Sequence, residues 1–569
     1  METNYSSTQY TPTIQHTHHP HPHPHPHPHP HPHPHPHHHP TPLDKCNNIK
    51  LKRNDYNLLQ LMQRNDKYYN KLRRINKTQT TNDVKNPRQS EINNQLITLY
   101  DCIDDEFKKF KTIERASLCF KHKFKRITDP NDKLIQKSLL SSSYIPPNIV
   151  KYIREKSRYV LEYKCDIGDK RTVTVYFIIF EDSKYELNNI RKKGASYFKN
   201  CILKIYLWLS LLAKYAHIKC GTNLSSYIYL TPFKRRLPGF KAEKDNGNIG
   251  SDSYNDYELY EDEYSHNNIL RPVNVNGGVS DVCETDANII VYRKEEWFKV
   301  FIHETMHNYG IDFSLLNITN ANKRLQNIFS IKKDIKIYES YCEIWARIMN
   351  VFFETYFDIN TNKKFSSRTT RRNFLDKLYE PSKSLTLHRH TGRSDGHAQG
   401  NGSAETGTMR LKNKYDVFFK KFYDSIQHET IFSLFQCIKV LDYMGLDYNI
   451  ISNCSDANYV TVNKLYKEET NVFAYYIVVA ILLANFNGFI LWCIDNNTNI
   501  FNFKKDEKNI DEFIQFIYKN YKNNDLLKLI VAIENKLETQ NTPDRRDRPD
   551  TQDNVLLSTM RMTVIGGGD

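Results

Sequence analysis

Residues 295–313 read EEWFKVFIHETMHNYGIDF, an apolar helical pattern that carries two histidines four positions apart. Side chains at positions i and i+4 of a helix lie on the same face, one turn apart. The imidazoles of His303 and His307 are therefore expected to reach the same metal ion. The strand-like run ANIIVY, residues 287–292, comes just before, so the pair would lie on a helix that follows a strand.

The glutamate beside the first histidine completes the pattern HExxH. A catalytic zinc site has three protein ligands and one open position, where zinc lowers the pKa of a water molecule towards neutrality. Glu304 is placed to take the proton of that water and to pass it to the leaving amine of a peptide. We therefore predict a zinc-dependent metallopeptidase, with Zn²⁺ bound by His303 and His307 and with Glu304 as the catalytic residue.

The alternative interpretation of this histidine pair is structural, as two buried side chains near a helix end. Fourteen of the 23 histidines lie between residues 16 and 40, which leaves nine for the rest of the chain. At that density a chance HExxH is expected on the order of one time in a hundred. A metal site is therefore the preferred interpretation.

A metzincin-type site is the first of two possibilities for the third ligand. In that pattern, HExxHxxGxxH/D, Gly310 stands where the glycine is needed. The ligand position then falls on Phe313, which cannot bind a metal, and Asp312 comes one residue too early. This possibility is the weaker one.

Two glutamates, Glu339 and Glu343, share one face of the helical run YESYCEIWAR at residues 338–347. A solvated helix face is the alternative, but the neighbours Tyr341 and Trp345 are typical of a buried helix. HExxH followed by Exxx(D/E) on a downstream helix resembles the gluzincins, the thermolysin-like metallopeptidases. The resemblance implies that Glu339 is the third zinc ligand and that Glu343 holds a zinc-bound histidine in its tautomer. The residues alone leave open which glutamate touches the metal.

The segments HETMHNYGIDFS and ESYCEIWARIMN are similar to uncharacterised gluzincin-type metallopeptidases encoded by giant DNA viruses. The resemblance covers residues 145–380 and 410–500, and implies a soluble chain that acts on a peptide or protein substrate. In gluzincins the strand before the zinc helix pairs with the extended substrate, which would here be residues 288–292. Four side chains are candidate donors to the oxyanion, and the sequence does not rank them: Tyr309, Tyr338, Tyr341 and His428.

The order of strand-like and helical runs predicts an α+β fold, a zincin-like catalytic domain with a small sheet and the helices of the metal site. Strands are expected at 159–163, 172–180, 226–230 and 287–292, and a long apolar helix at 197–216. The predicted organisation, in chain order, is a disordered His-Pro-rich tail (1–49), a basic helical region (50–140), the catalytic core (145–380), a flexible loop (381–412), a mostly helical C-terminal subdomain (413–540) and a disordered tail (541–569).

The chain carries a formal net charge of +15, and residues 50–126 contribute 19 basic and 9 acidic side chains to it. Such a surplus could bind nucleic acid or anionic lipid through phosphate contacts. A solvated lysine-rich surface is the simpler interpretation, because no zinc-finger or RNA-binding signature accompanies the charge. Nucleic acid is therefore an unsupported partner, and the oligomeric state is not predicted.

The 11 cysteines form no CxxC pair, so neither a cysteine zinc site nor a redox motif is supported. The first 40 residues contain no apolar stretch of the kind found in a signal peptide. Both observations favour free thiols and an intracellular location. For a viral protein, that location would be the host cytoplasm or the virion.

Residues 471–494, NVFAYYIVVAILLANFNGFILWCI, are 24 residues without a charge and are long enough to span a bilayer. Asn485, Asn487 and Gly488 interrupt the run, so two buried helices joined by a turn are the preferred interpretation. Two rivals to a soluble zinc peptidase stay open. One is a catalytically idle zincin-fold binding protein, and the other is a membrane-anchored peptidase.

Overall fold

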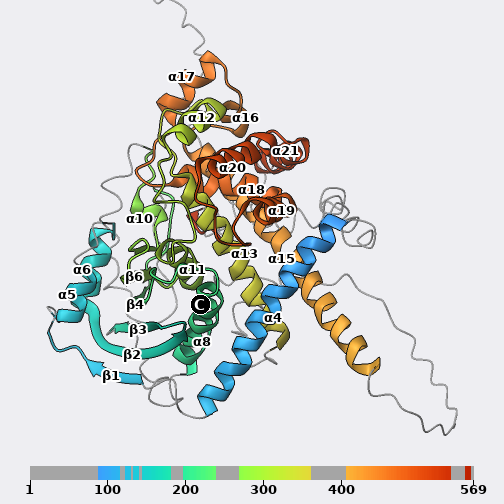
Figure 1. Cartoon of the computed structure of the whole chain (residues 1–569). Coiled ribbons are helices and arrows are strands. Elements are labelled where there is room, and N and C mark those ends of the chain that lie inside the picture. Colours follow the sequence, from blue (N-terminus) through green and yellow to red (C-terminus); the bar gives the residue numbers. More distant parts are fainter. Residues whose placement is uncertain are drawn as a thin grey trace, which may run out of the picture.

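The computed structural model describes residues 87–115, 122–129, 132–139, 144–180, 196–238, 268–360, 405–539 and 558–565. The predictions for the His-Pro-rich tail, for residues 50–86 and for most of the loop at 381–412 lie outside the described residues. Within them the protein has a mixed helical and β architecture, with one six-stranded sheet and a helical C-terminal half (Figure 1).

The sheet has the order β1-β2-β3-β4-β6-β5. Its strands are β1 (His122–Arg126), β2 (Ser157–Gly168), β3 (Arg171–Phe180), β4 (Asn223–Thr231), β5 (Gly278–Ser280) and β6 (Asp286–Arg293). The three central strands β3, β4 and β6 run parallel, and β1, β2 and β5 are antiparallel to their neighbours. The four strands expected from the sequence are therefore confirmed.

Side chains alternate between the two faces of the sheet, as the period of a strand requires. In β3, Val175 and Phe177 pack with the helices of the metal site, whereas Ile178 and Phe180 pack with helices α5 (Lys133–Leu139) and α6 (Pro147–Lys156). Figure 1 shows α5 and α6 on the side of the sheet away from α8 and α11. Central parallel strands are covered on both faces, which explains why their sequences are nearly continuous apolar runs.

The helices carry most of the core. The described helices besides α5 and α6 are α4 (Pro87–Arg115), α8 (Ser196–Ala213), α10 (Pro272–Val275), α11 (Trp297–Asn308), α12 (Thr319–Phe329), α13 (Ile337–Asn360), α15 (Glu405–Tyr443), α16 (Tyr448–Ser452), α17 (Asp456–Leu465), the π-helix η3 (Phe473–Val478), α18 (Val479–Ala484), α19 (Phe486–Asn496), α20 (Glu507–Asn520) and α21 (Asn524–Thr539). One hydrophobic cluster runs from the sheet through α8, α11 and α13 into the C-terminal helices.

Two boundaries differ from the expectation. The basic region at 50–140 is not helical throughout, because His122–Arg126 forms the edge strand β1 against β2. This strand, HKFKR, is short and polar, so only its pairing partner makes it a strand. The loop predicted over 381–412 ends earlier than expected, since α15 begins at Glu405.

The uncharged segment at 471–494 folds as two helical pieces, η3 with α18 and then α19, which meet at an angle of 93°. Most of its side chains are buried in the shared core. Among the described residues, no single helix is long and apolar enough to cross a membrane, and this bent pair meets the criterion by length and composition alone. The predicted break is present, but it falls at Asn485 alone, because α18 ends at Ala484 and α19 starts at Phe486.

The expectation of a disordered tail over 541–569 is wrong for residues 558–565. Met560, Met562 and Thr563 are 0–3% exposed, so this part of the tail packs inside the protein. Its sequence, STMRMTVI, has the alternation of apolar and polar side chains that an extended buried segment needs.

The expectation of free thiols is wrong for two cysteines, because Cys220 and Cys283 form a disulfide across 63 positions of sequence. The other described cysteines form no disulfide: Cys102, Cys165, Cys201, Cys342, Cys437, Cys454 and Cys493. The disulfide connects the segment before β4 to the segment between β5 and β6. A methyl group on Gly310 would come within 3.1–3.2 Å of both sulfurs, so the turn after α11 rests directly on the disulfide.

Replacing Cys283 by serine is expected to lower the free energy of unfolding by about 2–4 kcal/mol, because the disulfide no longer restricts the unfolded chain. Urea denaturation without reductant measures the change, and a reductant should bring the wild type to the level of the variant. Cys454→Ser, at an exposed free thiol, is the control and should change little. A non-reducing peptide map without a 220–283 link contradicts the assignment.

Candidate metal centre

Helix α11 holds the HExxH residues inside the protein. All twelve of its residues are buried, since one side packs on β5 and β6 and the other on α13. Thr305 is the middle one of the three residues between the two histidines. Its hydroxyl accepts a hydrogen bond of 2.6 Å from the indole of Trp208 on α8. The face that carries His303 and His307 is thereby turned towards α13, although 6% of each histidine stays accessible to solvent.

Three potential ligand atoms meet between α11 and α13. The Nε2 atoms of His303 and His307 are 3.2 Å apart, and the Oε2 atom of Glu339 lies 3.1 Å from the first and 3.4 Å from the second. These residues form a group that could hold a metal ion. The structure therefore brings Glu339 together with the two histidines, and their role as metal ligands stays a prediction.

The size of this triangle fits zinc. Zn–N and Zn–O bonds are about 2.0–2.1 Å long, so two ligand atoms of a tetrahedral site are separated by about 3.3 Å. The three observed separations of 3.1, 3.2 and 3.4 Å lie around this value. A tetrahedral ion on these three atoms would keep its fourth position open.

Each imidazole faces a carboxylate on the side away from the cluster. The Nδ1 atom of His307 lies 2.7 Å from Oδ2 of Asp312, and Nδ1 of His303 lies 3.2 Å from Oε2 of Glu343. The second contact is within ion-pair distance but lacks the alignment of a hydrogen bond. A proton on each Nδ1 leaves the lone pair of each Nε2 directed into the space shared with Glu339, as metal coordination requires.

Glu343 is held in place by two buried cations. Lys299 donates to both of its carboxylate oxygens at 2.9 Å, and Nε of Arg347 donates to Oε1 at 2.9 Å. Burial would raise the pKa of Glu343, but the charges of Lys299 and Arg347 and the contact with His303 lower it well below its ordinary value. Glu343 is therefore an anion whose position is fixed from two sides.

The surroundings of the two imidazoles are rich in negative charge. Four carboxylates contact or approach them, those of Glu304, Asp312, Glu339 and Glu343. The cations Lys299 and Arg347 both bind Glu343 and not the other three carboxylates. Burial alone would lower the pKa of His303 and of His307, yet the neighbouring acidic groups raise both values. A divalent cation on the cluster would neutralise the same excess.

Glu304 lies beside the cluster and is fixed by the edge strand β5. The hydroxyl of Ser280 donates to its Oε2 at 3.0 Å, and a methyl group on Gly278 would come within 2.9 Å of its Oε1. Burial raises the pKa of Glu304 above its ordinary value, although His303 and His307 act to lower it. A carboxylate with a raised pKa takes up a proton more readily near neutral pH.

Tyr475 reaches the cluster from the C-terminal helices, and the sequence did not point to it. Its hydroxyl donates to Oε2 of Glu339 at 2.8 Å, and its ring packs edge-on to His303. It lies in the π-helical turn η3, where its own carbonyl oxygen accepts a hydrogen bond of 3.1 Å from Arg347. Burial and the charge of Glu339 raise its pKa well above the ordinary value, so it stays a hydrogen-bond donor.

The four donors considered from the sequence have other surroundings. Tyr341 donates to the carbonyl of Phe501, away from the cluster. The ring of Tyr309 lies against Arg171, whereas the ring of Tyr338 lies 6.1 Å from that of His307. His428 is a buried residue of α15, and burial lowers its pKa to about 4.

A second set of potential ligands, His307, Asp312 and Cys342, shares one histidine with the first. The thiol of Cys342 lies 3.6 Å from Nδ1 of His307. Burial raises the pKa of this thiol strongly, which keeps it protonated and makes it a poor metal ligand. We therefore regard this set as the support of His307. Asp312 lies one residue before the position of the third ligand in metzincins. In this structure it contacts Nδ1 of His307 and so supports that histidine.

The strand expected to pair with a substrate is not at the edge of the sheet. β6, which contains residues 288–292, lies between β4 and β5 and is paired on both sides. The edge next to Glu304 belongs to β5, whose three residues are half-exposed. The sequence could not reveal β5, because GVS is too short to show a strand pattern.

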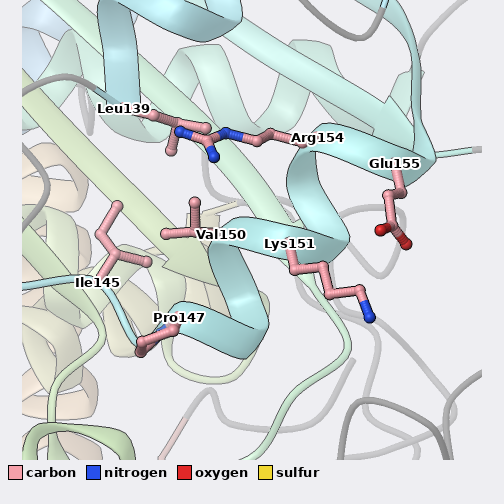
Figure 2. A pocket seen from close by; sticks show the side chains of 7 residues that line it. All are labelled: Leu139, Ile145, Pro147, Val150, Lys151, Arg154 and Glu155. Carbon is pink, nitrogen blue, oxygen red and sulfur yellow. The ribbon is translucent and has the colours of Figure 1, made fainter.

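A hollow of about 580 Å³ lies on the other side of the sheet (Figure 2). Figure 2 shows that α6 supplies most of its lining, with Leu139 and Ile145 completing an apolar floor beside Lys151 and Arg154. The residues that line it pack with α5 and α6 and include none of the metal-site residues. This hollow is therefore separate from the candidate metal centre.

The purified protein is expected to bind one zinc ion per chain, and His303→Ala and Glu339→Ala should each weaken binding at least 100-fold because they remove a ligand. Glu343→Gln should weaken it about 10–100-fold, since it changes only the support of His303. Glu354→Gln, on the same helix but paired with Lys204, is the control. Competition with a zinc chelator measures all four. Stronger loss for Glu343→Gln than for Glu339→Ala would reverse the two roles.

No protein-family model matches the sequence, and no curated protein or solved structure is significantly similar to it. The resemblance to gluzincins therefore stays a prediction from the motifs.

Proposed function

We propose that the protein is a zinc-dependent metallopeptidase of the gluzincin type, with a zincin-like catalytic domain. The observation that supports the proposal best is the convergence of three ligand atoms at tetrahedral spacing beside a separate buried carboxylate. His303, His307 and Glu339 would hold the ion. Glu304 is the remaining ionisable residue of the HExxH…E motif. It would not coordinate the ion and would therefore be available for proton transfer.

The chemistry divides between the ion and the side chains. Zinc, when bound, would polarise a water molecule and the peptide carbonyl. Glu304 would accept the proton of the attacking water and deliver it to the leaving nitrogen. Ser280 orients the Glu304 carboxylate from β5, and Gly278 leaves it the room it occupies.

The substrate would bind as an extended strand. β5 pairs with β6 on one side, and no described strand pairs with its other side. Main-chain groups on such an edge can hydrogen-bond a peptide by strand addition. Because Ser280 lies on this strand and also contacts Glu304, a peptide bound there would pass close to the proton-transfer group.

Tyr475 is the side chain best placed to act on the developing oxyanion. Its hydroxyl lies next to Glu339, and its raised pKa keeps the proton available for donation. A single donor of this kind typically contributes about 100- to 1000-fold to kcat.

Glu304→Gln is expected to lower peptide hydrolysis by at least 1000-fold while zinc affinity stays within a few-fold of the wild type. The amide keeps the shape and the hydrogen bond from Ser280, but it cannot take a proton. A general peptide mixture with mass-spectrometric detection of new termini measures the activity. Glu354→Gln serves again as control. A zinc-loaded wild type that cleaves nothing would favour the idle binding protein instead.

Tyr475→Phe is expected to lower kcat by about 100-fold or more with a smaller change in KM, since the lost bond would matter mainly in the transition state. Zinc content is measured in parallel, because the hydroxyl also contacts a ligand. Tyr448→Phe is the matched control, since its buried hydroxyl donates to the carbonyl of Tyr521 instead. Equal kcat values for Tyr475→Phe and the wild type would exclude the role.

A further inference from the structure

Residues 558–565, called the C-terminal segment below, are bound through their backbone. Thr559 forms an antiparallel bridge with Arg236, the amide of Leu237 donates to the carbonyl of Ser558, and the amide of Met560 donates to the carbonyl of Arg235. The segment therefore begins as a short added strand on residues 235–237.

Two buried carboxylates accept hydrogen bonds from the amides of residues 562–565. Oε1 of Glu296 accepts from the amides of Met562 and Thr563 at 3.0 and 2.6 Å. Oε1 of Glu429 accepts from the amides of Val564 and Ile565, each at 2.9 Å. Glu296 and Glu429 are 4% and 0% exposed, so water does not replace these donors in the closed protein.

The carbonyl groups of the segment are recognised as well. Tyr476 of η3 donates to Met560 at 2.6 Å, and Gln436 of α15 donates to Arg561 at 2.5 Å. Asn350 of α13 donates to the carbonyl of Ile565 at 2.9 Å. Donors from three helices and two buried acceptors thus form a peptide-binding groove. The groove binds its occupant through hydrogen bonds to the main chain.

This groove adjoins the helix of the metal centre. Glu296 is the residue immediately before α11 and has the left-handed φ of +59°, which is costly for a residue other than glycine. One turn later, Nζ of Lys299 lies 3.4 Å from Sδ of Met562 and also binds Glu343. The C-terminal segment therefore touches both the start of α11 and the cation that fixes the support of His303.

We propose that the C-terminal segment is a docked peptide ligand of the chain's own groove, and that its docking completes the metal centre by fixing the start of α11. Among the described residues, every hydrogen bond to Oε1 of Glu429 comes from this segment. Loss of these donors would leave Oε1 of Glu429 buried and unsatisfied, which is costly, so the groove is expected to rearrange when the segment leaves.

The length of chain before the C-terminal segment allows the segment to leave the groove and to dock again. Residues 540–557 join the segment to α21, and 18 residues can span up to about 60 Å. The segment is also translated after every ligand of the metal. Docking of the segment would therefore be a late step of folding, after the helices that carry the metal ligands have formed. The docking itself is independent of the proposed function, whereas its effect on zinc rests on the proposed metal centre.

Hydrogen exchange of the full chain, read by mass spectrometry, tests the docking. The amides of residues 562–565 should exchange at least 100-fold more slowly than in an open chain. Glu429→Leu removes the acceptor and should speed this exchange at least tenfold. Asp416→Leu, at an exposed acid on the same helix, should leave it unchanged. Open-chain exchange of these amides in the wild type overturns the docking.

Zinc affinity of the same variants, measured by chelator competition, tests the coupling. Glu429→Leu should bind zinc at least tenfold more weakly than Asp416→Leu. If the segment is released in Glu429→Leu but zinc affinity is unchanged, the coupling is wrong. If the wild type binds no zinc, the proposed metal centre fails, while the exchange data still decide the docking.

If Glu429→Leu does not fold, a second variant of the full chain tests the same coupling. A cleavage site for a sequence-specific protease, placed between residues 545 and 552, allows the linker to be cut after folding. Washing the cut protein should release the C-terminal peptide and at least 90% of the zinc, and adding the synthetic peptide 553–569 should restore zinc binding. Full zinc retention after release of the peptide overturns the proposal.

Discussion

The geometry of the candidate site depends on one buried interaction, the carboxylate of Glu343 between Lys299 and Arg347. Lys299 belongs to α11, whereas Glu343 and Arg347 belong to α13. The contact therefore fixes the distance and rotation between the two helices that supply the ligand atoms. Arg347 extends the link further, because it also donates to Ser433 of α15 and to the carbonyl of Tyr475 in η3. Four helical elements are thus linked through Glu343 and Arg347.

These buried charges add little stability by themselves, since desolvation of an ion pair usually offsets its Coulombic gain. A cluster of apolar side chains of the same volume would hold α11 against α13 at least as well. The apolar cluster could not, however, present a carboxylate to Nδ1 of His303 or aim Tyr475 at Glu339. The buried charges are best understood as the means by which the fold orients the ligand atoms.

The local elements of the site could be predicted from the sequence, because they follow from short-range patterns. The helix of HETMH, the strand ANIIVY before it and the helix of ESYCEIWAR are all present at the expected positions. The long-range partners could not be predicted. Tyr475 depends on a π-helical turn, Asp312 on the turn at Gly310, and Ser280 on a three-residue strand. None of these leaves a periodic signal.

The same distinction explains the errors outside the site. Residues 558–565 follow a polar stretch and precede three glycines, so composition places them in a tail. What holds them is a set of main-chain hydrogen bonds to Glu296, Glu429 and several helices, and composition carries no trace of such bonds. Cys220 and Cys283 are similarly far apart in sequence and adjacent only once β4 and β6 have paired.

The metal centre and the C-terminal segment pose the same physical problem, which is how to keep carboxylates inside a protein. Glu343 is compensated by two cations, and Glu296 by Arg235 together with two amides of the segment. Glu339 is compensated only by neutral donors and by imidazoles, whose pKa values it raises. Of the three, Glu339 is the one that lacks a permanent cation within the described protein. It is also the one whose oxygen stands at zinc-ligand spacing from two nitrogen atoms, which is where a divalent ion would complete the balance of charge.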